Sequence, residues 1–127
     1  MLVPIENNRF RMQEFQQNEH LPPTFLEKVT AIIEEQLHDE EFGVERLQKD
    51  LTISYPHMYR KIKEITGLSP SLYIRQLRLK RATYLLQKSE LQIGEIAYRV
   101  GFNTPNYFTN CFVELYGCTP SAFRDRA

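Results

Sequence analysis

The 127-residue sequence has only two cysteines, and no apolar run in it approaches the eighteen or so residues that a membrane span needs. Its start also lacks the basic-then-apolar pattern of a secretory signal peptide. Cys111 and Cys118 have no histidine nearby that would complete a metal site, so we interpret both as reduced thiols of a buried core. These absences predict a cytoplasmic chain with no membrane segment and no metal.

Patterns of catalytic residues are missing as well. No nucleophile, general base and oxyanion donor fall together, and the five glycines form no phosphate-binding loop. A chain of this length can form one compact domain or two small ones, but not a large enzyme cleft. We therefore expect neither an enzyme nor a bound cofactor.

The formal net charge is zero, but the two signs are divided along the chain. Residues 1–50 carry a net charge of −6, and residues 51–127 carry +6. The excess is concentrated in residues 54–81, which hold seven basic groups and one acidic group, whereas residues 82–127 are neutral. A basic segment of this kind indicates a polyanionic partner, so the zero net charge does not exclude nucleic acid.

A seven-residue phrase occurs twice, fifty residues apart. Residues 67–73 read GLSPSLY, and residues 117–123 read GCTPSAF. Two copies are too few for a stacked repeat array, which needs about three. The sequence therefore predicts a pair of related modules.

Apolar spacing and helix caps predict an all-α first half. Residues 1–23 contain a polar stretch, Gln13–His20, and end in two prolines, which is typical of a linker or partly disordered tail. A first helix is expected over residues 24–38 and a second over 44–51. Ser54 then caps a third helix, with a proline in its first turn, and Gly67 ends it.

The second half repeats this plan after a longer helix. That helix, expected from Ser69 to about Gln87, is apolar on two sides, as a helix buried between two modules would be. A short helix, a turn, a helix capped by Thr104 and a last short helix follow, with Phe108 and Phe112 in the core. The chain thus divides into a tail, a first subdomain, a linker helix and a second subdomain, over residues 1–23, 24–68, 69–88 and 89–127.

Each subdomain has the outline of a helix-turn-helix motif. A short helix, a tight turn and a second helix entered through a Ser or Thr cap form this motif, whose second helix fits the major groove of DNA. A single pattern of this kind is common among helical hairpins. Its duplication, with matched caps and glycines, favours a DNA-binding pair.

Several runs of residues carry a resemblance to AraC/XylS-type transcription regulators. They are GEIAYRVGFN at 94–103, Pro105-x-Tyr107-Phe108, Phe112, Tyr116-Gly117-x-Thr119-Pro120, Ser54-x-x-x-Met58-Tyr59-Arg60-Lys61, Thr66-Gly67-x-Ser69-Pro70 and Ile74-Arg75-x-Leu77-Arg78-Leu79-x-Arg81-Ala82. The resemblance covers roughly residues 43–126. Residues 24–38 and Asn8–Arg11 further resemble the segment that joins a receiver domain to this module in response regulators and hybrid two-component sensors.

The resemblance implies a fold and a function. The fold is an all-α pair of homeodomain-like helix-turn-helix subdomains joined by a linker helix, about seven helices in total. The function is sequence-specific binding of double-stranded DNA by a bacterial transcription regulator, with two recognition helices in successive major grooves. The intact regulator would add an upstream sensor or receiver domain, which this chain lacks, and RNA polymerase or a second copy as partners. The alternative is a protein-interaction module that uses the helix-turn-helix surface.

Carried over by position, the residues that face DNA bases would be Pro56, Tyr59, Arg60, Pro105, Asn106, Tyr107 and Asn110. Contacts to DNA phosphates are expected from Tyr55, His57, Lys61, Lys63, Arg75, Arg78 and Thr104. Arg60 is favoured most because a guanidinium can bond guanine O6 and N7 together, and Asn106 or Asn110 could pair with adenine. For Arg75 and Arg78, a structural ion pair is an equal alternative, for Arg78 with Glu95. His57 could equally be a solvated surface residue.

Three residues depart from the family pattern. Thr52 stands where the first turn commonly has glycine, Gln48 where a small residue is usual, and Asn110 where a basic residue is frequent. Because the second unit is also neutral, we expect the first unit and the linker helix to supply most of the attraction to phosphate.

Overall fold

The computed structural model describes residues 23–126, and the expected tail lies almost entirely outside them. Within this range the chain forms seven helices and no strand, as expected of an all-α fold. The helices are α2 (Phe25–Glu35), α3 (Val44–Leu51), α4 (Tyr55–Thr66), α5 (Pro70–Lys88), α6 (Ile93–Arg99), α7 (Pro105–Tyr116) and α8 (Pro120–Arg126). No helix among the described residues has both the length and the apolar character of a bilayer span.

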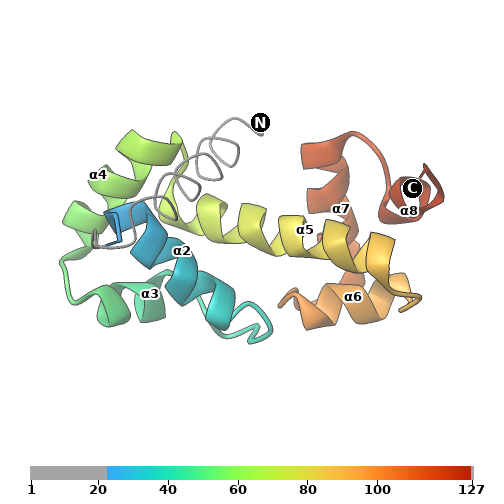
Figure 1. The fold of residues 1–127 in the computed structure, drawn as a ribbon, viewed down its shortest axis with the longest axis horizontal. Helices are drawn as coiled ribbons and strands as arrows, with labels where there is room; N and C mark the ends of the chain where they lie inside the picture. Colours follow the sequence, from blue (N-terminus) through green and yellow to red (C-terminus); the bar gives the residue numbers. More distant parts are fainter. Residues whose placement is uncertain (1–22, 127) are drawn as a thin grey trace.

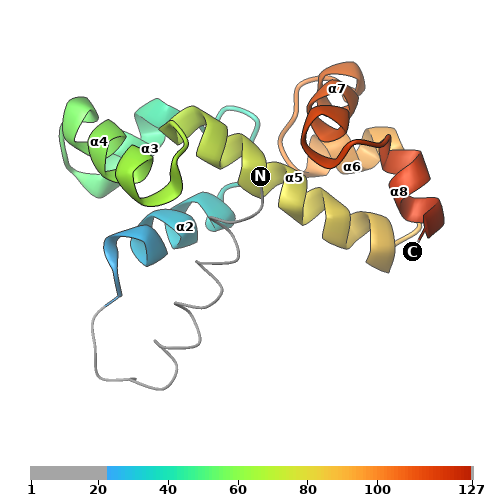
Figure 2. The same ribbon diagram turned by 90° about the horizontal axis from the view of Figure 1, so that it is seen from above.

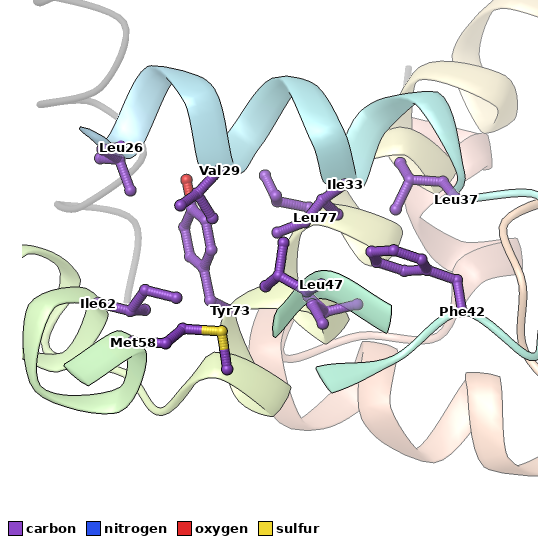
Figure 3. Packing of buried hydrophobic residues seen from close by; sticks show 11 residues of the cluster. Leu26, Val29, Ile33, Leu37, Phe42, Leu47, Met58, Ile62, Tyr73 and Leu77 are labelled. Atoms are coloured by element: carbon purple, nitrogen blue, oxygen red, sulfur yellow. The ribbon is translucent and has the colours of Figure 1, made fainter. Parts of the chain in front are cut away.

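The first half of the chain packs α2, α3 and α4 around one end of α5 (Figure 1). A capping box starts α2: the Thr24 hydroxyl accepts from the Glu27 backbone N–H at 3.1 Å, and the Glu27 carboxylate accepts from the Thr24 N–H at 2.7 Å. The helix ends at Glu35, three residues earlier than expected, and a turn follows. Figure 3 shows Tyr73 and Leu77 of α5 among the buried side chains of the other three helices.

The long helix α5 contributes to two separate cores. Its first part supplies Tyr73, Ile74 and Leu77 to the first hydrophobic cluster. Its second part supplies Leu79, Ala82 and Leu86 to a second cluster built with α6, α7 and α8. The expectation that this helix is buried from two sides is therefore correct. Figure 2 shows the two groups of helices on either half of α5.

Aromatic rings fill much of the second core. Phe108 and Phe112 are fully buried, as predicted, and the Phe112 ring lies 4.7 Å from the ring of Tyr116 and 5.6 Å from that of Phe123. Cys111 is buried among them. Cys118, in contrast, is only half-buried because it lies in the turn between α7 and α8, so its assignment to the core was wrong.

Candidate nucleic-acid interface

The first candidate recognition helix is α4, and its caps and buried side chains fix which side faces outward. The Ser54 hydroxyl accepts from the His57 backbone N–H at 3.3 Å, and a proline occupies the first turn. Met58, Ile62 and Thr66 recur every four residues and are all buried. Because these side chains hold one face in the core, the opposite face is presented to solvent.

The outward face of α4 holds the residues expected to meet DNA. The rings of Tyr55 and Tyr59 lie 6.1 Å apart at an angle of 48°, and both are partly exposed. Arg60 is exposed and has no hydrogen-bond or ion-pair partner among residues 23–126. Lys61 is more confined, because its Nζ lies 4.8 Å from the centre of the Phe25 ring. The guanidinium of Arg60 is therefore available for a ligand.

The second candidate recognition helix, α7, is built in the same way. The Thr104 hydroxyl accepts from the Tyr107 backbone N–H at 3.1 Å, and Pro105 opens the helix. Phe108, Cys111 and Phe112 form its buried face. The outward face carries Asn106 and Asn110, both exposed.

Tyr107 is held from two sides, which its sequence position did not predict. Its ring lies 5.7 Å from the Phe102 ring, and its hydroxyl accepts from Arg75 Nη1 at 3.3 Å. Arg75 Nη2 also lies 3.4 Å from the Glu114 carboxylate. Arg75 therefore joins the linker helix to α7 through two contacts, while its side chain remains about one-third exposed.

Arg78 corrects a prediction, because it is buried and cannot reach a phosphate. The residue is 6% exposed, and its guanidinium donates to four backbone carbonyl oxygens. Burial lowers the pKa of this guanidinium, and the nearby charge of Asp39 opposes that effect. The alternative ion pair with Glu95 is not formed either, since Glu95 pairs with Arg99 at 3.0 Å.

The other expected site residues fall into two groups. Pro105, Lys61 and Arg75 are half-buried. The exposed ones are Tyr55, Pro56, His57, Tyr59, Arg60, Lys63, Thr104, Asn106, Tyr107 and Asn110. The outward faces of α4 and α7 are therefore not packed into the interior of the protein.

The two candidate recognition helices lie on the same side of the molecule. In Figure 1, α4 and α7 both lie above α3 and α6, and in Figure 2 both lie toward the edge opposite α2 and α8. A groove of about 280 Å³ separates the two units, lined by residues that include Leu72, Arg75, Phe102 and Tyr107. The arrangement offers two exposed helix faces to one extended ligand.

Positive charge is concentrated on α4 and α5. Exposed or half-buried basic residues of these helices are Arg60, Lys61, Lys63, Arg75, Lys80, Arg81 and Lys88. By comparison, α7 contains no basic residue. A polyanion would therefore be attracted mainly to the first unit and the linker helix.

Comparison with known proteins identifies the family. A model of the helix-turn-helix domain matches residues 47–126, more than half of the chain. The chain is 33% identical to histidine kinase P4 of Formosa agariphila over 96% of this chain and 10% of the kinase. It is 31% identical to the HTH-type transcriptional activator RhaS of Escherichia coli strain SE11, over 90% of this chain and 41% of the activator.

Solved structures give the same result. The C-terminal domain of the two-component response regulator yesN from Fusobacterium nucleatum is 35% identical, with a TM-score of 0.71 over 77% of this chain and 95% of that one. The DNA-binding domain of AdpA, solved in complex with a target DNA, is 30% identical, with a TM-score of 0.73 over 78% and 88%.

The chain spans about a tenth of the curated kinase and two fifths of the curated activator. The matched segment, residues 47–126, is a helix-turn-helix domain, and the relatives RhaS and yesN are a transcriptional activator and a response regulator. The chain belongs to the AraC/XylS-type family of helix-turn-helix DNA-binding domains.

Proposed function

We propose that this domain binds double-stranded DNA sequence-specifically, with α4 and α7 in two successive major grooves of one site. The observation that carries the proposal is the pair of exposed helix faces on one side of the 19-residue helix α5. A helix of that length spans roughly 28 Å. Successive major-groove faces on one side of B-DNA lie about 34 Å apart, which is similar to the length of the helix that carries both units.

The proposal extends to the intact protein. Relatives include a histidine kinase and response regulators, which supports an upstream sensor or receiver domain and a cytoplasmic transcription regulator of a two-component system. RNA polymerase and a second copy of the intact regulator are the further partners that we expect.

Selection from a random double-stranded DNA library tests both parts of the binding proposal, the sequence specificity and the use of two major grooves. The domain should enrich a motif with two blocks centred about one helical turn apart. Hydroxyl-radical footprinting on that motif should protect both blocks. Enrichment of one block alone would refute the two-groove mode, and the absence of any enriched motif would refute sequence-specific binding.

Substitution of Arg60 and Asn110 tests which unit dominates. Because a bidentate arginine–guanine contact contributes about 1–3 kcal/mol of discrimination, Arg60→Ala should weaken binding to the selected site by about 5- to 150-fold. Asn110→Ala should weaken it less, since the second unit lacks the basic charge of the first. Lys28→Ala, on the exposed face of α2, is the control. A titration in which Asn110→Ala has the larger effect would reverse the ranking.

A further inference from the structure

The guanidinium of Arg78 lies at the seam between the two units. Arg78 follows Leu77, which belongs to the first hydrophobic cluster, and precedes Leu79, which belongs to the second. These two clusters have no residue in common. Apolar packing therefore relates the two units only through the shared helix α5.

Arg78 bonds to both units at once. Its Nη1 donates to the Leu37 carbonyl, just after α2. The same nitrogen donates at 2.8 Å to the Val100 carbonyl, at the end of α6. Its Nη2 donates to the carbonyls of Asp39 and Phe42, at 3.2 and 2.9 Å. A single nitrogen atom thus connects the first unit to the turn of the second helix-turn-helix.

The charge of Arg78 is matched to this position. The Val100 carbonyl lies at the C-terminal end of α6, where partial negative charge favours a cation. Buried carbonyl groups without a donor would be unfavourable, and so would a buried guanidinium without acceptors. Each group therefore satisfies the other, and displacing the guanidinium would leave both unpaired.

Gly101 completes the arrangement. Its φ of +91° lies in the region that favours glycine, and a Cβ built at this residue would overlap the Arg78 guanidinium and the Leu37 carbonyl oxygen. The turn of the second unit can approach α2 this closely only because residue 101 has no side chain. Gly101 and Arg78 thus form one contact between the units.

We propose that Arg78 is a positioning residue for DNA recognition: it fixes α7 relative to α4 and so sets the distance and angle between the two DNA half-sites that the domain accepts. This inference rests on the proposed function. The second polar link between the units, from Arg75 to Tyr107 and Glu114, is exposed and its contacts are longer, at 3.3 and 3.4 Å. It is therefore the weaker constraint.

The test varies the spacing of the half-sites. The selected motif is rebuilt with one or two base pairs inserted or removed between its blocks, and an insertion of two base pairs rotates one block by about 70° around the helix axis. The wild-type domain should lose at least about tenfold in affinity on that insertion, because a rigid protein must deform the DNA to follow it.

The central variant is Arg78→Lys. Lysine keeps the charge and the aliphatic stem, but its single ammonium cannot replace a planar fork that reaches four carbonyls. Affinity for the best spacing should fall, and the penalty for the two-base-pair insertion should shrink to less than about threefold. Arg126→Lys, at an exposed position of α8, is the control and should retain the wild-type spacing preference.

Gly101→Ala is a second variant. Its methyl group would displace the guanidinium, although residue 78 is still arginine. Residual dipolar couplings of the free domains give a readout without DNA. One alignment tensor should fit both units of the wild type, whereas the variants should need two.

Unchanged spacing preference and a single shared tensor in the folded variants would overturn the proposal. So would failure of both variants to fold, because Arg78 would then be a determinant of the fold. Wild-type protein that binds no DNA would instead refute the proposed function.

Discussion

Thr52 adopts a backbone conformation that its side chain disfavours. It has φ 55° and ψ 39°, and among residues 23–126 it is the only residue other than glycine with a positive φ. The left-handed conformation costs a residue with a Cβ about 1–2 kcal/mol, and β-branching makes it an outlier. The turn of the second unit places Gly101 at the matching point, so only the first turn bears this strain.

Replacement of Thr52 by glycine should stabilise the domain. The relief of strain is partly offset by the greater freedom of glycine in the unfolded chain, about 0.5–1 kcal/mol, so we expect a net gain of about 0.5–1 kcal/mol. Urea denaturation followed by circular dichroism measures it. Thr52→Ala is the control: it keeps a Cβ and should gain less. A lower unfolding free energy for the glycine variant would contradict the strain.

At this scale, residues that act on their own neighbours in the chain were predictable. The caps Ser54 and Thr104 and the core residue Phe108 follow from local hydrogen bonding and helical spacing, and the structure has them as expected. The role of Arg78 did not follow. Its partners are backbone carbonyls 22 to 41 residues away, and carbonyls leave no mark on side-chain patterns.

At the scale of elements, α7 and α8 meet through a group of aromatic rings that includes Tyr116. Burial raises the pKa of the Tyr116 hydroxyl to about 12. No described residue forms a hydrogen bond with this hydroxyl, so loss of water contact is the cause. Folding thus favours the protonated phenol over the phenolate.

The raised pKa of Tyr116 makes the stability of the domain fall as the pH rises above 10. Below the ordinary tyrosine pKa of 10, Tyr116 is protonated in both the folded and unfolded states, and its contribution to stability is fully present. Between pH 10 and about 12 the unfolded chain loses its proton first, so stability falls. Between pH 9 and pH 11 the melting temperature of the Tyr116→Phe variant should therefore fall less than that of the wild type. The difference between the two falls should be about 3 °C, because the ring is partly exposed. An equal fall in both proteins would contradict this, and Tyr84→Phe, at an exposed tyrosine, is the control.

Helix boundaries were predictable where a sequence signal marks them. Gly67 ends α4 in the left-handed conformation, and two-sided apolarity identified α5 as the shared helix. The end of α2 has no glycine or proline to mark it, and there the expectation ran three residues too far. The exposure of Cys118 depends on how α8 folds back, which apolar spacing cannot specify.

At the scale of the whole molecule, the distribution of charge follows the helices. Burial of Arg78 removes one of the seven cations of residues 54–81 from the surface, and Arg75 is partly engaged by Glu114. The cations that remain on α4 and α5 are those most available to phosphate. Counting charged residues along the sequence therefore located the basic segment correctly, but it overestimated the charge that is accessible on the surface.

The salt dependence of DNA binding should report this distribution. Each phosphate neutralised by a cation adds a slope of about −0.9 to the plot of log binding constant against log salt concentration. Lys63 is exposed on α4, so Lys63→Gln should make the slope less steep by nearly one such unit. Lys28→Gln removes the same charge from α2, away from the side that carries α4 and α7, and should leave the slope unchanged. Fluorescence anisotropy titrations of the selected site across a series of KCl concentrations measure both slopes. Equal slopes for wild type and Lys63→Gln would mean that α4 does not approach the DNA backbone through this residue.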